Sequence, residues 1–244
     1  MFSRVKGFSE NQKEEINIIE SVIGINSENK EEVRKLVRDF HEKGAGSHPF
    51  IFMCIEHAAM IRPRERESQF HLLHTLLCDF NYNDRLIFQP VLRNMLKVKG
   101  IIHKEEYYTS EHIFDFAKEG TIARSIYDDD VEALRLLLAT PTDEKISIEP
   151  FFTDSLIGIL NGDVSQIECS ALFGSIECFK YLFMNTSMHD KRLSSFAIAG
   201  GSNEIVRICE QNCLFDDESL YHSVIFHRFD LFEWINSHSF VQKS

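Results

Sequence analysis

The chain has 244 residues, of which 43% are hydrophobic and 26% charged, with 11 glycines and 5 prolines. This composition excludes a collagen-like, low-complexity or wholly disordered protein. The length allows one large domain or two small ones.

The net charge of −12 is unevenly placed along the chain. Residues 1–120 carry 17 basic and 19 acidic side chains, whereas residues 121–244 carry 9 and 19. An acidic C-terminal half repels nucleic acid and anionic lipid, because both are bound chiefly through Lys and Arg. We therefore expect no nucleic-acid partner and no membrane partner; a protein with basic patches fits this charge better.

Cysteine spacing and apolar runs indicate the compartment. The six cysteines, at positions 54, 78, 169, 178, 209 and 213, form no CxxC motif, so most are expected to be buried thiols in a reducing compartment. The N-terminus has no apolar stretch typical of a secretory signal. The most apolar run, 50–61, is shorter than the roughly 20 residues of a membrane span. We expect a soluble, cytoplasmic protein, and association with the cytoskeleton stays open.

Apolar residues recur at helical spacing along almost the whole chain, and period-two alternation is nearly absent. Ser47 is a predicted N-cap with Pro49 in the first turn, and Pro63 ends one helix and opens the next. In the first half, the pattern predicts helices over residues 9–23, 28–43, 48–61, 64–80, 84–98 and 109–119. In the fourth of these, the residues expected to face the core are Phe70, Leu73, Leu77 and Phe80.

The second half repeats one helix–turn–helix pattern at 124–139, 168–185, 195–212 and 219–236. The copies align on four anchor residues: Asp129, Gly174, Gly201 and His227. A small residue stands four positions before each anchor, and an acid stands three positions after it. We predict a left-handed backbone at the anchor, where glycine costs least, and an acid in the first turn of the second helix. Neither helix buries its apolar face alone, so the copies must stack.

This register resembles the ankyrin repeat. The phrases SALFGSIECFKYLFMN, FAIAGGSNEIVRICEQN and EHAAMIRPRERE resemble, more narrowly, a large protozoan (trichomonad-type) family of ankyrin-repeat proteins that have a helical N-terminal region. The resemblance spans roughly residues 48 to 238. No copy has the TPLH signature, and the spacings of 27 and 26 residues are shorter than the usual 33. The resemblance implies a protein-interaction role and supplies no catalytic residues.

Together these patterns predict an all-α fold. A helical N-terminal array over 1–120 precedes degenerate ankyrin-like repeats over 121–238, which form a helical solenoid, and a tail follows at 239–244. The predicted function is non-catalytic protein binding by a scaffold or adaptor. The alternative is a structural subunit of a larger assembly, such as a cytoskeletal or axonemal complex, whose neighbour covers an apolar face around Phe229, Phe232 and Trp234.

Contact residues are expected on the longer loops between the copies and on the last copy. A stack of repeats exposes a rigid groove of inner helices and loop tips, so binding there costs little ordering entropy. The predicted binding residues are Met188, His189, Asp190, Lys191, Phe215, Asp216, Asp217, Phe226 and Trp234.

The sequence supports a metal site or a catalytic site less well than it supports a binding surface. His71, His74 and Cys78 share one helical face, but no fourth metal ligand is evident. The acids at 128–130 lack the ligand spacing of an EF-hand and are better explained as opening a helix. No GxSxG, HExxH or Cys–His signature is present. We therefore expect no catalytic residue, no cofactor and no metal, and the chain is not expected to be an enzyme.

Overall fold

The computed structural model describes residues 9–44, 47–81, 90–102, 113–114, 117–139, 146, 164–186, 190–212 and 214–239. Every regular element in these ranges is helical, as predicted, and one isolated β-bridge joins Ile146 to Val164. The chain divides into two compact units, Met1–Phe114 and Asp115–Ser244. No helix in the described part of the chain is long and apolar enough to cross a membrane.

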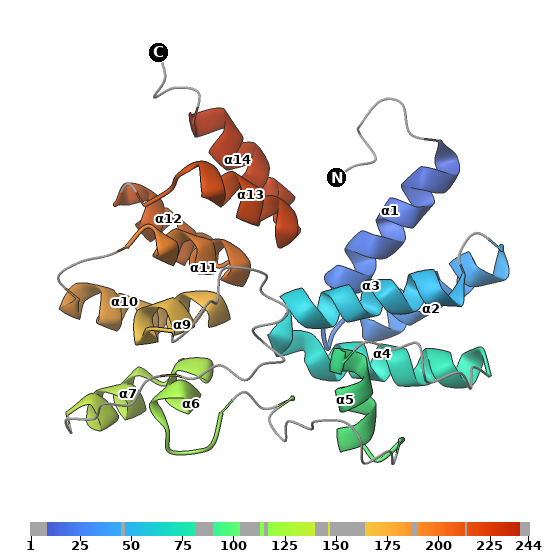
Figure 1. Ribbon diagram of the computed structural model, residues 1–244, viewed down its shortest axis with the longest axis horizontal. Helices are drawn as coiled ribbons and strands as arrows, with labels where there is room; N and C mark the ends of the chain where they lie inside the picture. Colours follow the sequence, from blue (N-terminus) through green and yellow to red (C-terminus); the bar gives the residue numbers. More distant parts are fainter. Residues whose placement is uncertain are drawn as a thin grey trace. The chain divides into compact units, whose positions relative to one another are not determined.

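The first unit is built around one apolar helix. Its described elements are α1 (Glu10–Ile23), α2 (Lys30–Glu42), α3 (His48–Ile61), the 3₁₀ turn η2 (Pro63–Glu65), α4 (Arg66–Asp79) and α5 (Pro90–Val98). Helix α3 contacts α1, α4 and α5, and α2 packs against α1 and α4 (Figure 1). Most of α3 is buried, because apolar residues cover most of its circumference. Ser47 caps α3 with Pro49 in the first turn, as predicted.

The predicted helix over 109–119 is wrong where the structure describes it. Residues 113–114 and 117–119 are bends, turns or irregular backbone, and residues 109–112 and 115–116 lie outside the described part. In a helix, the carbonyl of Ile113 would accept from the Ala117 amide. Here that carbonyl accepts a 3.0 Å hydrogen bond from Nη1 of Arg66. The first six residues of the helix predicted at 84–98 also lie outside the described part.

Two buried polar residues of α4 close the C-terminal end of α3. Nε2 of Gln69 donates to the carbonyls of Ala58 (3.0 Å) and Arg62 (3.2 Å). Nε of Arg66 donates to the carbonyl of Ala59 at 3.1 Å. The Ala58 carbonyl also accepts from the Arg62 amide, but carbonyls at the end of a helix lack their full set of intrahelical partners, so these side chains supply additional hydrogen bonds there. The pair of helices is thereby joined by polar contacts inside the core.

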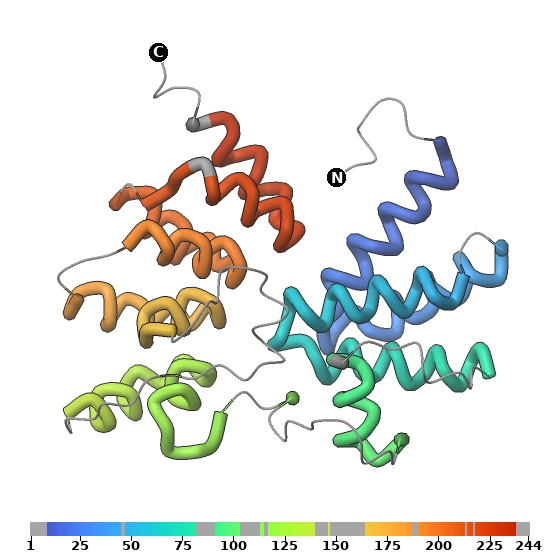
Figure 2. Tube along the Cα trace, in the orientation of Figure 1, coloured from blue at the N-terminus to red at the C-terminus, as the bar shows by residue number. Residues whose placement is uncertain are grey.

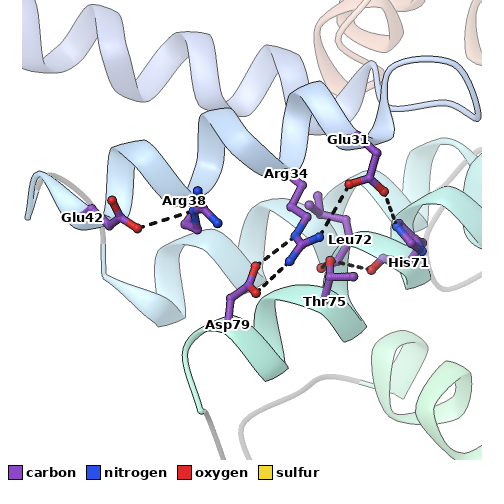
Figure 3. Close-up of polar contacts among 8 residues, drawn as sticks. All are labelled: Glu31, Arg34, Arg38, Glu42, His71, Leu72, Thr75 and Asp79. Carbon is purple, nitrogen blue, oxygen red and sulfur yellow. Dashed lines mark hydrogen bonds and ion pairs between the residues drawn. The ribbon is translucent and has the colours of Figure 1, made fainter.

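A polar network joins α2 to α4 (Figure 3). Nη2 and Nε of Arg34 hold the two carboxylate oxygens of Asp79 at 2.8 and 3.0 Å. Nε2 of His71 lies 2.7 Å from Oε1 of Glu31, whose other oxygen is 3.6 Å from Nη1 of Arg34. The hydrogen bonds from Arg34 hold the pKa of Asp79 below its usual value. Paired guanidinium and carboxylate planes make this the best-defined ion pair between the two helices.

Replacing Asp79 by asparagine is expected to reduce stability by about 1 kcal/mol at pH 7, because the variant loses the bidentate ion pair. The folded-state pKa of Asp79 is lowered, so its stabilisation is present above the usual value near 3.8 and disappears as the pH falls below it. Unfolding free energies of both proteins at pH 7, 5 and 3.5 check this. A difference between them that stays constant from pH 7 to 3.5 would contradict it.

The described residues of the second unit form four helical hairpins. They are α6 (Ile122–Tyr127) with α7 (Val131–Leu138), α9 (Gln166–Phe173) with α10 (Ile176–Asn185), α11 (Arg192–Gly200) with α12 (Asn203–Gln211), and α13 (Asp217–Ile225) with α14 (Phe229–Ser239). The first helix of each hairpin contacts the first helix of the next, in the order α6, α9, α11, α13 (Figure 2). The second helices form a parallel row, in which α7 contacts α10 and α10 contacts α12. Successive hairpins therefore bury their faces against one another.

The predicted register of the hairpins is confirmed. All four anchors have left-handed backbones, with φ of 58° at Asp129, 65° at Gly174, 71° at Gly201 and 49° at His227. The small residues four positions earlier are all buried, at Ser125, Ser170, Ala197 and Ser223. The acids three positions later fall in the first turns of the second helices, at Glu132, Glu177, Glu204 and Asp230. One local rule thus sets the turn of every hairpin.

Gly174 isolates the effect of the left-handed turn from packing. A Cβ added there would meet only Cβ of Ser202 at 3.6 Å, which is ordinary van der Waals contact. Gly174→Val is therefore expected to cost about 2 kcal/mol through backbone strain alone, and Gly174→Asn less than about 1 kcal/mol. Urea unfolding of the two variants measures this difference. Equal midpoints for valine and asparagine would contradict the left-handed register.

Asp129 links the first hairpin to the second. Its carboxylate accepts from the backbone amides of Glu177 (3.2 Å) and Cys178 (2.9 Å) at the start of α10. The residue before α10, Ser175, instead donates its hydroxyl to the carbonyl of Ile126. The capping hydrogen bonds at the start of α10 therefore come from Asp129 of the preceding hairpin and not from Ser175, its N-cap residue. The left-handed turn at Asp129 presents the carboxylate that makes this contact.

Asp129→Gly is expected to destabilise the second unit by about 1 kcal/mol, because α10 loses its capping carboxylate. Glycine also relieves the left-handed strain, so any destabilisation reports the lost cap. Asp129→Asn keeps an acceptor oxygen and tolerates the same backbone, and should cost less. Thermal unfolding of the three proteins checks the order. A glycine variant as stable as the parent would show that the cap contributes no more than the relieved strain, which would contradict the expected loss.

The cysteines behave largely as predicted. Cys54, Cys169, Cys178 and Cys209 are buried, Cys78 is exposed, and Cys213 lies outside the described part. Burial raises the pKa of Cys54 to about 11 and that of Cys209 to about 12. Because the thiolate is the reactive form, these two thiols are inert core residues.

Candidate functional site

Three of the predicted contact residues meet at one cavity. Asp190 and Lys191 immediately precede α11, and Asp216 is the N-cap of α13. The cavity has a volume of about 320 Å³, and we call it the α11–α13 cavity. Its lining consists of Asp190, Lys191, Arg192, Ser195, Asp216, Glu218 and His222. Met188 and His189 lie outside the described residues, as does the side chain of Asp217.

Hydrogen bonds fix the start of α13 beside α11. Oδ1 of Asp216 accepts from the Ser219 amide at 3.2 Å, and Oγ of Ser219 accepts from the Asp216 amide at 3.1 Å. These reciprocal bonds form a capping box. The Ser219 hydroxyl also lies 3.2 Å from the buried hydroxyl of Ser194 on α11. The two helix starts that line the cavity are therefore held together before any ligand binds.

The α11 side of the cavity is organised by a charged residue that already has partners. Nη1 of Arg192 lies 3.3 Å from Oε1 of Glu168 on α9, and its guanidinium lies 5.1 Å from the centre of the Phe196 ring. The Arg192 amide donates to Oδ1 of Asp190 at 3.3 Å. Arg192 is thus tied to α9 and to its own helix, whereas Lys191 and Asp190 are exposed.

His222 is the buried polar residue of the cavity. Only 8% of it is exposed, and its Nδ1 has no hydrogen-bond partner among the described residues. Burial lowers its pKa, although the carboxylates of Glu218 and Asp216 act in the opposite direction. The imidazole is therefore neutral at pH 7 and offers one nitrogen as an acceptor.

Not every predicted contact residue reaches the surface. The prediction for Phe226 is wrong: it is fully buried, and its amide donates to the His222 carbonyl at the end of α13. The chain turns there so that α14 packs back onto α13, which encloses the ring. Phe215 and Trp234 are half-buried and contact each other edge to face, with ring centres 5.9 Å apart. Trp234 belongs to α14 and Phe215 to the loop before α13, so this ring contact packs the helix against the loop.

The apolar face of the last hairpin differs from the predicted one. Phe229, Phe232 and Trp234 are half-buried, whereas Tyr221 and Val224 of α13 are 61% and 47% exposed. The residues of α11 at the same register positions as Tyr221 and Val224, Ser195 and Ile198, are buried, because α13 packs against α11. We call Tyr221 and Val224 the last-hairpin face. It lies on α13, not on the second helix of the hairpin.

Four of the residues that line the cavity were not predicted from the sequence: Arg192, Ser195, Glu218 and His222. One signal was available for His222. In the repeat register it occupies the position of Phe196 in α11 and Cys169 in α9, which are both fully buried apolar residues. A histidine at a core position of the repeat marks a place where the last copy departs from the pattern.

The acidic and histidine-rich segments have structural partners. Asp130 caps α7 by accepting from the Ala133 amide at 2.9 Å, which confirms the acids as a helix start. His71 contacts Glu31, and the ring of His74 stacks on Phe70 with centres 5.8 Å apart. In the ranges that the structure describes, no group of three or more His, Cys, Asp or Glu side chains is placed to hold a metal.

No protein-family model, no curated protein and no solved structure matches this chain. The resemblance to ankyrin repeats therefore rests on the register of the hairpins and on the quoted phrases.

Proposed function

We propose that the chain is a non-catalytic protein-binding module, an ankyrin-like scaffold or adaptor that acts in the cytoplasm. The observation that carries this proposal is the α11–α13 cavity, where polar loop residues of two successive hairpins converge. The capping box of α13 and the contact between Ser194 and Ser219 hold the cavity walls in place. A preorganised surface loses little conformational entropy when a partner binds, which favours recognition by such walls.

The second candidate is a structural subunit of a larger assembly, such as a cytoskeletal or axonemal complex. The last-hairpin face favours it, because Tyr221 and Val224 expose apolar surface at positions that are buried in the preceding hairpin. In a stack of hairpins, a face of this kind is normally covered by a neighbour. A permanent neighbour would make the chain a fixed building block.

Affinity capture with three matched variants tests the proposal. The tagged full chain is captured from soluble and from detergent-resistant fractions, and the recovered proteins are quantified by mass spectrometry. Glu218→Gln alters the cavity rim, Val224→Asp alters the last-hairpin face, and Leu136→Asp is a control at a 75% exposed apolar residue of α7. All three side chains are exposed, so the fold should be unaffected.

The two candidates predict different results. An adaptor recovers substoichiometric partners from the soluble fraction, and Glu218→Gln reduces their recovery. A structural subunit recovers a near one-to-one partner set from the detergent-resistant fraction, and Val224→Asp abolishes it. Two results would overturn the proposed function. One is that the chain recovers no more protein than the tag alone. The other is that all variants, including Leu136→Asp, recover the same amount.

A further inference from the structure

We infer that the α11–α13 cavity receives a basic side chain, arginine or lysine, from an exposed segment of the partner protein. This inference rests on the proposed function and names the chemistry that the cavity recognises.

Charge is the first argument. Three carboxylates line the cavity, from Asp190 beside α11 and from Asp216 and Glu218 at the start of α13. Of the two lining cations, Arg192 is already engaged by Glu168 and lies over a phenyl ring. Lys191 alone is left to oppose the three carboxylates. The cavity therefore attracts a cation, in the half of the chain that carries 9 basic and 19 acidic side chains.

The unpaired nitrogen of His222 is the second argument. A buried polar atom normally has a hydrogen-bond partner, and Nδ1 of His222 has none in the part of the chain that the structure describes. The fold does not require a polar group at this position, because Phe196 and Cys169 occupy it in the two preceding hairpins. His222 lines the cavity, and an N–H donor that enters there and displaces the atoms covering Nδ1 gives the neutral imidazole the hydrogen bond that it lacks. Guanidinium and ammonium groups bring such donors together with the charge that the carboxylates favour.

The volume of the cavity and the nearby ring of Tyr221 suit a single basic side chain. A volume of about 320 Å³ is at the small end of the range of ligand pockets, which is about 300–1,000 Å³. The exposed ring of Tyr221 has its centre 5.7 Å from that of His222. Tyr221 does not line the cavity, so its ring offers a cation–π surface only to a basic group held at the rim beside His222. Anionic ligands, by contrast, would meet three carboxylates and one exposed lysine.

Nuclear magnetic resonance of the full-length, ¹⁵N-labelled chain tests the inference directly. The probes are three blocked pentapeptides of alanine that carry arginine, glutamine or glutamate at the centre. The arginine peptide is expected to shift the His222 ring nitrogens and the amides of 190–195 and 216–222. Its affinity should exceed that of the glutamine peptide by about fivefold or more, which is the scale of one or two partly exposed charge pairs.

Two variants make the test specific. His222→Phe restores the aromatic residue found at the same position of α11, so the fold is retained while the acceptor is lost. Glu218→Gln removes one rim charge at an exposed position. Each should weaken binding of the arginine peptide at least about threefold, whereas Leu136→Asp should leave it unchanged.

The inference is overturned if the glutamine or glutamate peptide binds as tightly as the arginine peptide, if no shift occurs at the cavity, or if both cavity variants bind like the parent. Failure of the inference is separable from failure of the proposed function. Captured partners that depend on Glu218 while the arginine peptide does not bind would refute the basic ligand alone. A capture that recovers nothing would refute the proposed function whatever the peptides do.

Discussion

Gly200→Ala is expected to destabilise the second unit by about 3 kcal/mol or to prevent it from folding. Gly200 lies in the last turn of α11, and an added Cβ would be 2.1 Å from the carbonyl oxygen of Ala171 and 2.8 Å from that of Leu172. Both atoms belong to the backbone of α9, so no side-chain rotation removes the clash. Accommodating the methyl group would require the two helices to separate, and overpacking of this kind is strongly destabilising.

The sign of this effect makes it a sharp test. Helix propensity alone predicts that alanine should stabilise this position by about 1 kcal/mol. The matched control is Gly174→Ala, where the added Cβ meets only an ordinary contact and the cost is that of the left-handed backbone, about 1 kcal/mol. Urea unfolding followed by fluorescence of Trp234, the single tryptophan, reports on the second unit. A Gly200→Ala variant at least as stable as the parent would mean that α9 and α11 are not packed this closely.

Arg66→Met is expected to cost the first unit about 3 kcal/mol or more. Arg66 is fully buried and donates to the carbonyls of Ala59 at 3.1 Å and Ile113 at 3.0 Å. Methionine fills much of the space but has no donor, so both carbonyls are left unpaired in the core. The end of α3 and the segment at 113–114 would lose the side chain that joins them.

Arg38→Met is the matched control for this substitution. The Arg38 side chain is 46% exposed and forms a 3.5 Å ion pair with Glu42 at the surface, so its loss should change stability by less than about 1 kcal/mol. Amide hydrogen exchange of α3 and α4 provides the readout for the first unit. Equal exchange rates in the two variants would show that the buried guanidinium contributes no more than a surface one.

The hairpins were predictable because local chemistry decides them. A left-handed anchor, a small residue before it and an acid after it are properties of the turn, and a single sequence displays them at Gly174 and Gly201. The same holds for Ser47 as the N-cap of α3. Such features depend on a few neighbouring residues and not on what the helix packs against.

The orientation of helices in the core was predicted less well. On α4, Leu73 and Leu77 are buried as expected, but Phe70 and Phe80 are only half-buried. The buried face is turned toward Arg66 and the polar residues beside it, because these bond the end of α3. A hydrophobicity pattern places arginine outside, so a buried arginine that satisfies backbone carbonyls cannot be read from periodicity.

The candidate site was predicted in its location but not in its composition. The loop tips at Asp190 and Asp216 follow from the spacing of the repeats, whereas Glu218 and His222 join them only because α13 packs beside α11. Phe226 was misplaced because the turn into α14 encloses it. Contacts between residues of different hairpins depend on how the hairpins stack. The local repeat pattern does not reveal that stacking.

Hydrogen–deuterium exchange of the full chain, alone and with a captured partner, tests the central claim most directly. The account predicts slower exchange in the complex at 190–195 and 216–222, the two segments that contain the lining residues of the α11–α13 cavity, with no change on α7. Protection confined to the first unit, or to the second helices α7, α10 and α12, would contradict it.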